Sequence, residues 1–131
     1  MKRILPMLLL LPLMLTGCTA AVPAKEPGSY RQIGMQEAME MMDTEKDYII
    51  LDVRRQDEYD AGHIPGAILI PNETIGTEEI PGLPDKDQLI LVYCRSGNRS
   101  KQASEKLVKL GYTNIVEFGG INSWPGEVVT D

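Results

Sequence analysis

The feature that most constrains the fold is an unbroken apolar run, Leu89 to Tyr93, that ends at Cys94. A strand with one wet face alternates apolar and polar side chains, so a strand without alternation must be covered on both faces. After the cysteine, apolar residues recur at helical spacing, which predicts a helix from near Ser100 to Gly111. A covered strand that leads into a helix is typical of parallel sheets, and Cys94 would lie at the turn between the two.

The rest of the chain repeats this alternation of apolar runs and helical patterns. Strands are predicted at Tyr30–Ile33 (a short edge strand), Tyr48–Leu51, Ala67–Ile70 and Asn114–Phe118, helical segments at Met35–Met42 and Arg55–Ala61, and a short closing segment at Ile121–Trp124. Residues 72–86 are rich in proline and glycine, which predicts an irregular connection, and Gly119-Gly120 is expected to end the last strand. The pattern predicts an α/β fold of three layers, with a mainly parallel central sheet flanked by helices.

The N-terminus has the organisation of an export signal. A basic start precedes an apolar run from Ile4 to Leu15, which is short for a membrane span. The segment Leu15-Thr16-Gly17-Cys18 resembles the lipobox of bacterial lipoproteins, whose cysteine is lipid-modified and becomes the first residue of the mature chain. A plain secretory signal and an uncleaved anchor are the alternatives.

These boundaries divide the chain into three parts. We expect a signal peptide at 1–17, the lipidated Cys18 with a flexible tether at 18–28, and one folded domain at 29–131. The resemblance implies an extracytoplasmic location, in the periplasm or at the cell surface, with a bacterial membrane as partner through the lipid. A lipidated Cys18 cannot form a disulfide, so Cys94 would be the only thiol of the mature chain.

The charge distribution favours a small anion as ligand. The net charge is −6, which argues against nucleic acid as a partner. Between Gln88 and Ser104, however, there is no acidic residue, whereas Arg95, Arg99 and Lys101 lie there. A local positive site against an acidic background suits a small anionic substrate.

Cys94 has the surroundings of a reactive cysteine. A helix N-terminus and neighbouring arginines both stabilise a thiolate, which is the nucleophilic form of the side chain. The loop that follows contains a glycine and small polar residues, so its amides can turn inward and bind an anion. A buried structural cysteine is the alternative, but two arginines beside such a thiol would be costly without an anionic ligand.

Three motifs in this order resemble those of rhodanese-like sulfurtransferases. Cys94-Arg95-Ser96-Gly97-Asn98-Arg99-Ser100 looks like the active-site loop of the family. The upstream signature is similar to Leu51-Asp52-Val53-Arg54 with Glu58-Tyr59 and then Gly62-His63-Ile64-Pro65-Gly66-Ala67, and the closing motif to Gly119-Gly120-Ile121 with Trp124.

The resemblance implies a rhodanese-like α/β domain and a sulfurtransferase that works without a cofactor or metal. Cys94 would take a sulfane sulfur from a donor such as thiosulfate, hold it as a persulfide, and pass it to cyanide or a thiol. The substrate-binding residues it implies are Arg95, Ser96, Gly97, Asn98 and Arg99. The alternatives are a catalytically silent binding or sensing module and a phosphatase or arsenate reductase. The relatives with phosphatase or reductase activity have a longer loop than the four residues that separate Cys94 from Arg99 here.

Other residues of the motifs allow more than one interpretation. Asp52, at the end of a strand, either orients an arginine of the loop or caps the following helix. Arg54 and Glu58, four residues apart, are expected to form a local ion pair. His63 is expected to be a turn residue and not a base for Cys94, and Trp124 either packs in the core or covers the site.

Overall fold

The computed structural model describes residues 28–131, so Cys18, the predicted signal peptide and most of the predicted tether lie outside the described residues. The elements, in chain order, are β1 (Arg31–Gln32), α1 (Met35–Thr44), β2 (Tyr48–Asp52), α2 (Gln56–Ala61), β3 (Ile68–Leu69), the 3₁₀ turn η1 (Asn72–Thr74), β4 (Leu89–Cys94), α3 (Asn98–Lys109), β5 (Ile115–Gly120) and the 3₁₀ turn η2 (Ile121–Ser123). The order of strands and helices agrees with that predicted from the sequence.

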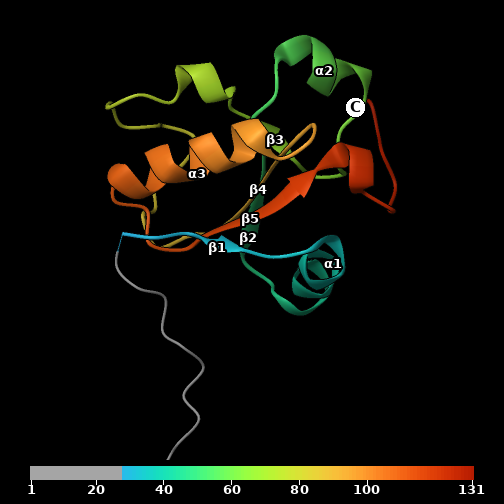
Figure 1. Ribbon diagram of the computed structural model, residues 1–131, viewed down its shortest axis with the longest axis horizontal. Helices are drawn as coiled ribbons and strands as arrows, with labels where there is room; N and C mark the ends of the chain where they lie inside the picture. Colours follow the sequence, from blue (N-terminus) through green and yellow to red (C-terminus); the bar gives the residue numbers. More distant parts are fainter. Residues whose placement is uncertain (1–27) are drawn as a thin grey trace, which may run out of the picture.

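The five strands form one sheet in the order β1-β5-β4-β2-β3, and every pairing between them is parallel. The uninterrupted apolar strand β4 is central and all six of its residues are buried. Because the strands are parallel, β2, β4 and β5 end at the same edge, where Asp52, Cys94 and Gly120 lie (Figure 1). This edge is where ligands bind in open α/β sheets.

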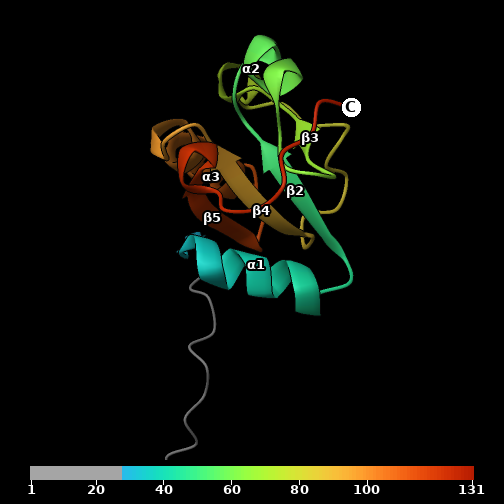
Figure 2. The same ribbon diagram turned by 90° about the vertical axis from the view of Figure 1, so that its right-hand side faces the viewer.

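Helices cover both faces of the sheet, so the predicted three-layer α/β architecture is confirmed (Figures 1 and 2). On one face, α3 packs through Ala103 and Leu107 against a core that includes Val92 and Cys94. On the other face, α1 contributes Ala38, Met35, Met41 and Met42 to a second core. The side chains of that second core from the sheet are Ile50, Leu89, Leu91, Tyr93, Val116 and Phe118. The sulfur of Cys94 therefore belongs to the α3 side.

Two boundaries at the site differ from those predicted. The helix α3 begins at Asn98, two residues before the expected start, because Gly97 has a positive φ of 112° and turns the chain directly into the helix. The strand β5 does not end at Phe118 but continues through Gly119 and Gly120. Glycine weakens a strand, yet here Gly120 pairs with Cys94 in the sheet.

Gly120 allows the cysteine loop to lie directly on β5. A Cβ atom built at Gly120 would collide with the carbonyl group of Arg95 and the amide nitrogen of Ser96. The register of β4 against β5 also shifts between Val92 and Cys94, an irregularity of the kind found beside active sites. One turn further on, the amide of Asn122 donates a hydrogen bond to the Arg95 carbonyl at 3.2 Å. Gly120 and Asn122 of the closing motif thus hold the cysteine loop in place.

Replacing Gly120 by alanine should therefore destabilise the domain by about 1–3 kcal/mol, the usual cost of overpacking a tight contact. The measurement is the free energy of unfolding in urea. Gly76→Ala is the matched control, since a Cβ at Gly76 meets no atom within 4 Å, and it should change stability by less than about 0.5 kcal/mol. Equal effects of the two substitutions would contradict the close contact between loop and strand.

Candidate active site

Cys94 is the last residue of β4 and is 1% exposed. Its sulfur accepts a hydrogen bond from the Gly97 amide at 3.0 Å, and the positive φ of Gly97 turns that amide back toward the strand end. Only glycine adopts this backbone conformation at little cost. An N–H aimed at the sulfur favours its negative form, and the N-terminus of α3 adds to this. The inward amide that the sequence predicted is present at Gly97.

Behind the sulfur, Ser100 and Glu117 form a buried polar pair. The Ser100 hydroxyl lies 3.4 Å from the Cys94 sulfur and 2.7 Å from Oε1 of Glu117. The same carboxylate oxygen accepts the Gly119 amide at 2.8 Å. Ser100 is fully buried and Glu117 is 3% exposed. A carboxylate from β5 is thus joined through one hydroxyl to the thiol of β4.

Ser100 was predicted from the sequence only as part of the loop motif, and Glu117 was not singled out. A signal for Glu117 was available, because it is a charged residue within the otherwise apolar strand Ile115–Phe118. Buried charged groups are uncommon unless they are hydrogen-bonded, so this interruption marks a functional candidate.

The remaining loop residues face solvent. Arg95, Ser96 and Asn98 are exposed, whereas Gly97 is buried. On the side towards β1 and α1, Ser96 and Gly97 line an open cavity of about 450 Å³ together with Glu117 and Gly119. The guanidinium of Arg95 is therefore available to an anion arriving from solvent, and the cavity gives small molecules room beside the loop.

Arg99, in contrast, is held by an acid. Its two terminal nitrogens donate to the two carboxylate oxygens of Glu58, at 2.6 and 3.0 Å. These hydrogen bonds are the main reason why the pKa of Glu58 falls to about 2, and they also raise the pKa of Arg99. Glu58 belongs to α2, so the ion pair ties that helix to the cysteine loop. The prediction of a local ion pair between Arg54 and Glu58 is therefore wrong, because Glu58 binds Arg99 and Arg54 binds Asp52.

Asp52 orients an arginine, but not one from the loop. Its carboxylate accepts hydrogen bonds from the Arg54 side chain at 2.7 to 3.0 Å and from the Arg54 amide at 2.9 Å. It also accepts the Tyr93 hydroxyl at 2.7 Å. Asp52 is fully buried and Arg54 is 5% exposed. These contacts show neither of the two expected roles of Asp52, which were to support a loop arginine or to cap a helix. Through its hydrogen bond with Tyr93, Asp52 instead joins the end of β2 to β4.

His63 and Trp124 have structural contacts. The His63 ring stacks on Tyr59 with centroids 3.7 Å apart, and its Nδ1 lies 2.9 Å from the Tyr59 carbonyl oxygen. Trp124 packs beside Phe118, and its indole N–H donates to the Glu127 carbonyl at 3.0 Å. These contacts agree with a turn residue for His63 and with core packing for Trp124.

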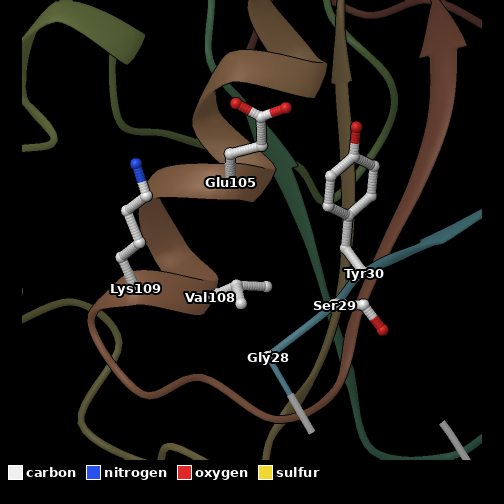
Figure 3. A pocket seen from close by; sticks show the side chains of 6 residues that line it. All are labelled: Gly28, Ser29, Tyr30, Glu105, Val108 and Lys109. Carbon is white, nitrogen blue, oxygen red and sulfur yellow. The ribbon is translucent and has the colours of Figure 1, made fainter. Parts of the chain in front are cut away.

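Other features of the described chain lie away from the sulfur. A hollow of about 260 Å³ lies between α3 and the first described residues. Figure 3 shows the residues that line it: Gly28, Ser29, Tyr30, Glu105, Val108 and Lys109. It shares no residue with the cysteine loop. Within residues 28–131, no three histidine, cysteine, aspartate or glutamate side chains are grouped to hold a metal ion. In the same range, no helix has the length and apolar character of a membrane span.

The Glu58–Arg99 pair should make stability depend on pH in acid. A carboxyl whose pKa is lowered on folding stabilises the fold above its unfolded pKa, here 4.5, and this stabilisation is lost as the pH falls towards about 2. We expect Glu58→Gln to flatten this part of the acid dependence of the unfolding free energy, measured with urea between pH 7 and 2. Glu105→Gln, an exposed residue of α3, should leave it unchanged. Curves for wild type and Glu58→Gln that run parallel would contradict the assignment.

Comparison with known proteins identifies the family. Residues 35–127 match the model of the Rhodanese-like domain. The chain is similar to Thiosulfate sulfurtransferase PspE of Escherichia coli K12, with 38% identity over 71 residues, 54% of this chain and 68% of that protein. It is also similar to Thiosulfate sulfurtransferase GlpE of Coxiella burnetii, with 33% identity over 96 residues, 72% of this chain and 87% of that protein.

Solved structures agree with this result. A rhodanese with anions from E. coli superposes with a TM-score of 0.58 at 35% identity, over 64% of this chain and 99% of that chain. A rhodanese-related protein from Thermoplasma volcanium gives a TM-score of 0.65 at 33% identity, over 78% of this chain and all of the other. The motifs, the parallel sheet and the matched residues all lead to one conclusion: the chain belongs to the rhodanese-like domain family.

Proposed function

We propose that this protein is a sulfurtransferase that carries a sulfane sulfur on Cys94. The observation that carries the proposal is the Gly97 amide, 3.0 Å from a buried sulfur at the N-terminus of α3. A thiolate is a soft nucleophile suited to attack sulfur, and this amide stabilises it. The relatives named thiosulfate sulfurtransferase support the same reaction class.

The reaction has two transfers. In the first, the Cys94 thiolate attacks the outer sulfur of thiosulfate, the sulfur–sulfur bond of the donor breaks, and sulfite leaves with the electron pair. In the second, cyanide or a thiolate attacks the terminal sulfur of the Cys94 persulfide, and the bond to Sγ breaks to regenerate the thiolate. Storing the sulfur covalently separates donor from acceptor and predicts ping-pong kinetics.

The two arginines of the loop have different parts in this proposal. Arg95 is exposed and is the cation that attracts the anionic donor. Arg99 is 28% exposed and neutralised by Glu58, so its main role is to hold α2 against the loop. The Gly97 amide, which donates to the Cys94 sulfur, would also stabilise the persulfide anion.

Substitution Cys94→Ser should lower the rate of thiocyanate formation from thiosulfate and cyanide by about 10³-fold or more, because the nucleophile is lost. In the wild type, initial rates measured against thiosulfate at several cyanide concentrations should give parallel double-reciprocal lines. An equal rate in the variant would contradict the proposal. Hydrolysis of a small phosphate ester without thiocyanate formation would favour the phosphatase alternative, and a domain inert towards all donors would favour a binding module.

We also propose that the domain is anchored to a bacterial membrane by a lipid on Cys18, outside the cytoplasm. The support is the sequence Leu15-Thr16-Gly17-Cys18 after a short apolar run. Metabolic labelling of the full chain with an alkyne fatty acid should mark the wild type, and Cys18→Ala should remove the label. Cys94→Ser is the control and should keep it. Label that persists in Cys18→Ala would contradict the anchor.

A further inference from the structure

One buried acid has no part in the sulfur chemistry described so far. Glu117 of β5 is 3% exposed, and its Oε1 accepts hydrogen bonds from the Ser100 hydroxyl at 2.7 Å and from the Gly119 amide at 2.8 Å. A carboxylate in such a place is costly unless its hydrogen bonds satisfy it. One of those bonds comes from the residue that also contacts the nucleophilic sulfur, so the acid and the thiol are joined through a single hydroxyl.

Ser100 has one hydroxyl proton, and several acceptors compete for it. Besides Glu117, these are the carbonyl oxygens of Gly97 at 2.9 Å and Gly119 at 3.4 Å. The carboxylate is both the nearest and the charged acceptor, so the Ser100 hydroxyl donates its hydrogen bond to Glu117 when Glu117 is ionised. The Cys94 S–H then donates to the free lone pair of the Ser100 oxygen at 3.4 Å. In this arrangement Ser100 supports a neutral thiol.

We propose that Glu117 accepts the proton of Cys94 through Ser100. The S–H bond breaks and its proton passes to the Ser100 oxygen, while the original hydroxyl proton of Ser100 passes to Oε1 of Glu117. The result is a neutral Glu117 and a Cys94 thiolate that accepts two hydrogen bonds, one from the Ser100 hydroxyl and one from the Gly97 amide. The number of protons and the total charge stay the same, so no ion enters or leaves the buried site.

The surroundings of Glu117 allow the proton to reach solvent afterwards. Glu117 lines the open cavity of about 450 Å³ beside the loop, together with Lys101 of α3 and Glu37 of α1. The residue of β1 paired with Glu117 is Gln32, which is uncharged. Arg99, which is paired with Glu58, also interacts electrostatically with Cys94. Among the described residues, Glu117 is the carboxylate that hydrogen-bonds Ser100.

The relay deepens the proposed function and rests on it, since it supplies the thiolate that attacks the donor. Glu117 does not touch the sulfur, so it acts as a positioning residue through Ser100. Its effect is visible without any sulfur donor, because alkylation of Cys94 by iodoacetamide also requires the thiolate. A test by alkylation therefore stands or fails separately from sulfurtransferase activity.

The experiment measures the alkylation rate constant of the folded wild type and of Glu117→Gln against pH. In the wild type, Glu117 takes the proton as Cys94 reacts, so alkylation is assisted by an internal base. The amide introduced by Glu117→Gln keeps a hydrogen-bond acceptor but cannot take a proton. The rate constant of this variant should therefore be about tenfold or more below that of the wild type at about pH 6. Glu37→Gln, in the same cavity, should keep the wild-type rate.

Two results for Glu117→Gln would overturn the proposal. A profile identical to that of the wild type would mean that Glu117 only holds the Ser100 hydroxyl in place. A faster reaction than the wild type at every pH would mean that the carboxylate only repels the thiolate. Ser100→Ala provides a second test if Glu117→Gln does not fold, because it also interrupts the relay and should slow alkylation by a similar factor. A wild-type rate in Ser100→Ala would equally overturn the relay.

Discussion

The site depends on the close contact between the end of β5 and the loop that follows Cys94. Gly120 has no side chain, so the Arg95 carbonyl and the Ser96 amide lie directly on the strand. The loop is held there by the Asn122 amide, and the Gly97 amide then points at the sulfur. A side chain at Gly120 would displace the loop from β5. The Gly97 amide would then move away from the Cys94 sulfur and lose its hydrogen bond to it. The chemistry of β4 is thus determined by a glycine on the neighbouring strand.

Two ion pairs at this edge of the sheet help to join separate elements of the fold. Asp52 and Arg54 bind the end of β2 to Tyr93 of β4, and Glu58 ties α2 to Arg99 of the loop. Buried or partly buried pairs of this kind contribute more to a defined geometry than to net stability. Arg95 remains outside these pairs with its side chain exposed. The cations left to attract an anion in the proposed reaction are therefore Arg95 and Lys101, a smaller positive charge than the loop sequence suggests.

Much of the fold could be predicted because its signals are local. The apolar run of β4 showed that the strand is buried on both faces, and helical spacing located α1 and α3. Two predicted boundaries were wrong. The strand β5 continues to Gly120 because Gly120 pairs with Cys94 of β4, and α3 begins early because Gly97 turns the chain. Neither effect is visible in the residues of the element itself.

The candidate site could be predicted in part for the same reason. Cys94 and its loop form a continuous motif, but the partners of the charged residues come from distant positions. Glu58 was expected to pair with Arg54, but its partners are the nearby Arg55 and the distant Arg99. Glu117 meets Ser100 only because β5 lies beside α3. Sequence spacing favours neighbours along the chain, whereas the parallel sheet brings together residues that follow different strands.

The mass of the intact protein after it reacts with thiosulfate tests most directly whether Cys94 carries the sulfur. We expect that the domain gains the mass of one sulfur atom, that peptide mapping places this atom on Cys94, and that cyanide removes it again. A protein that turns over thiosulfate without ever gaining sulfur, or that gains it at a residue other than Cys94, would contradict the claim that Cys94 carries the sulfur.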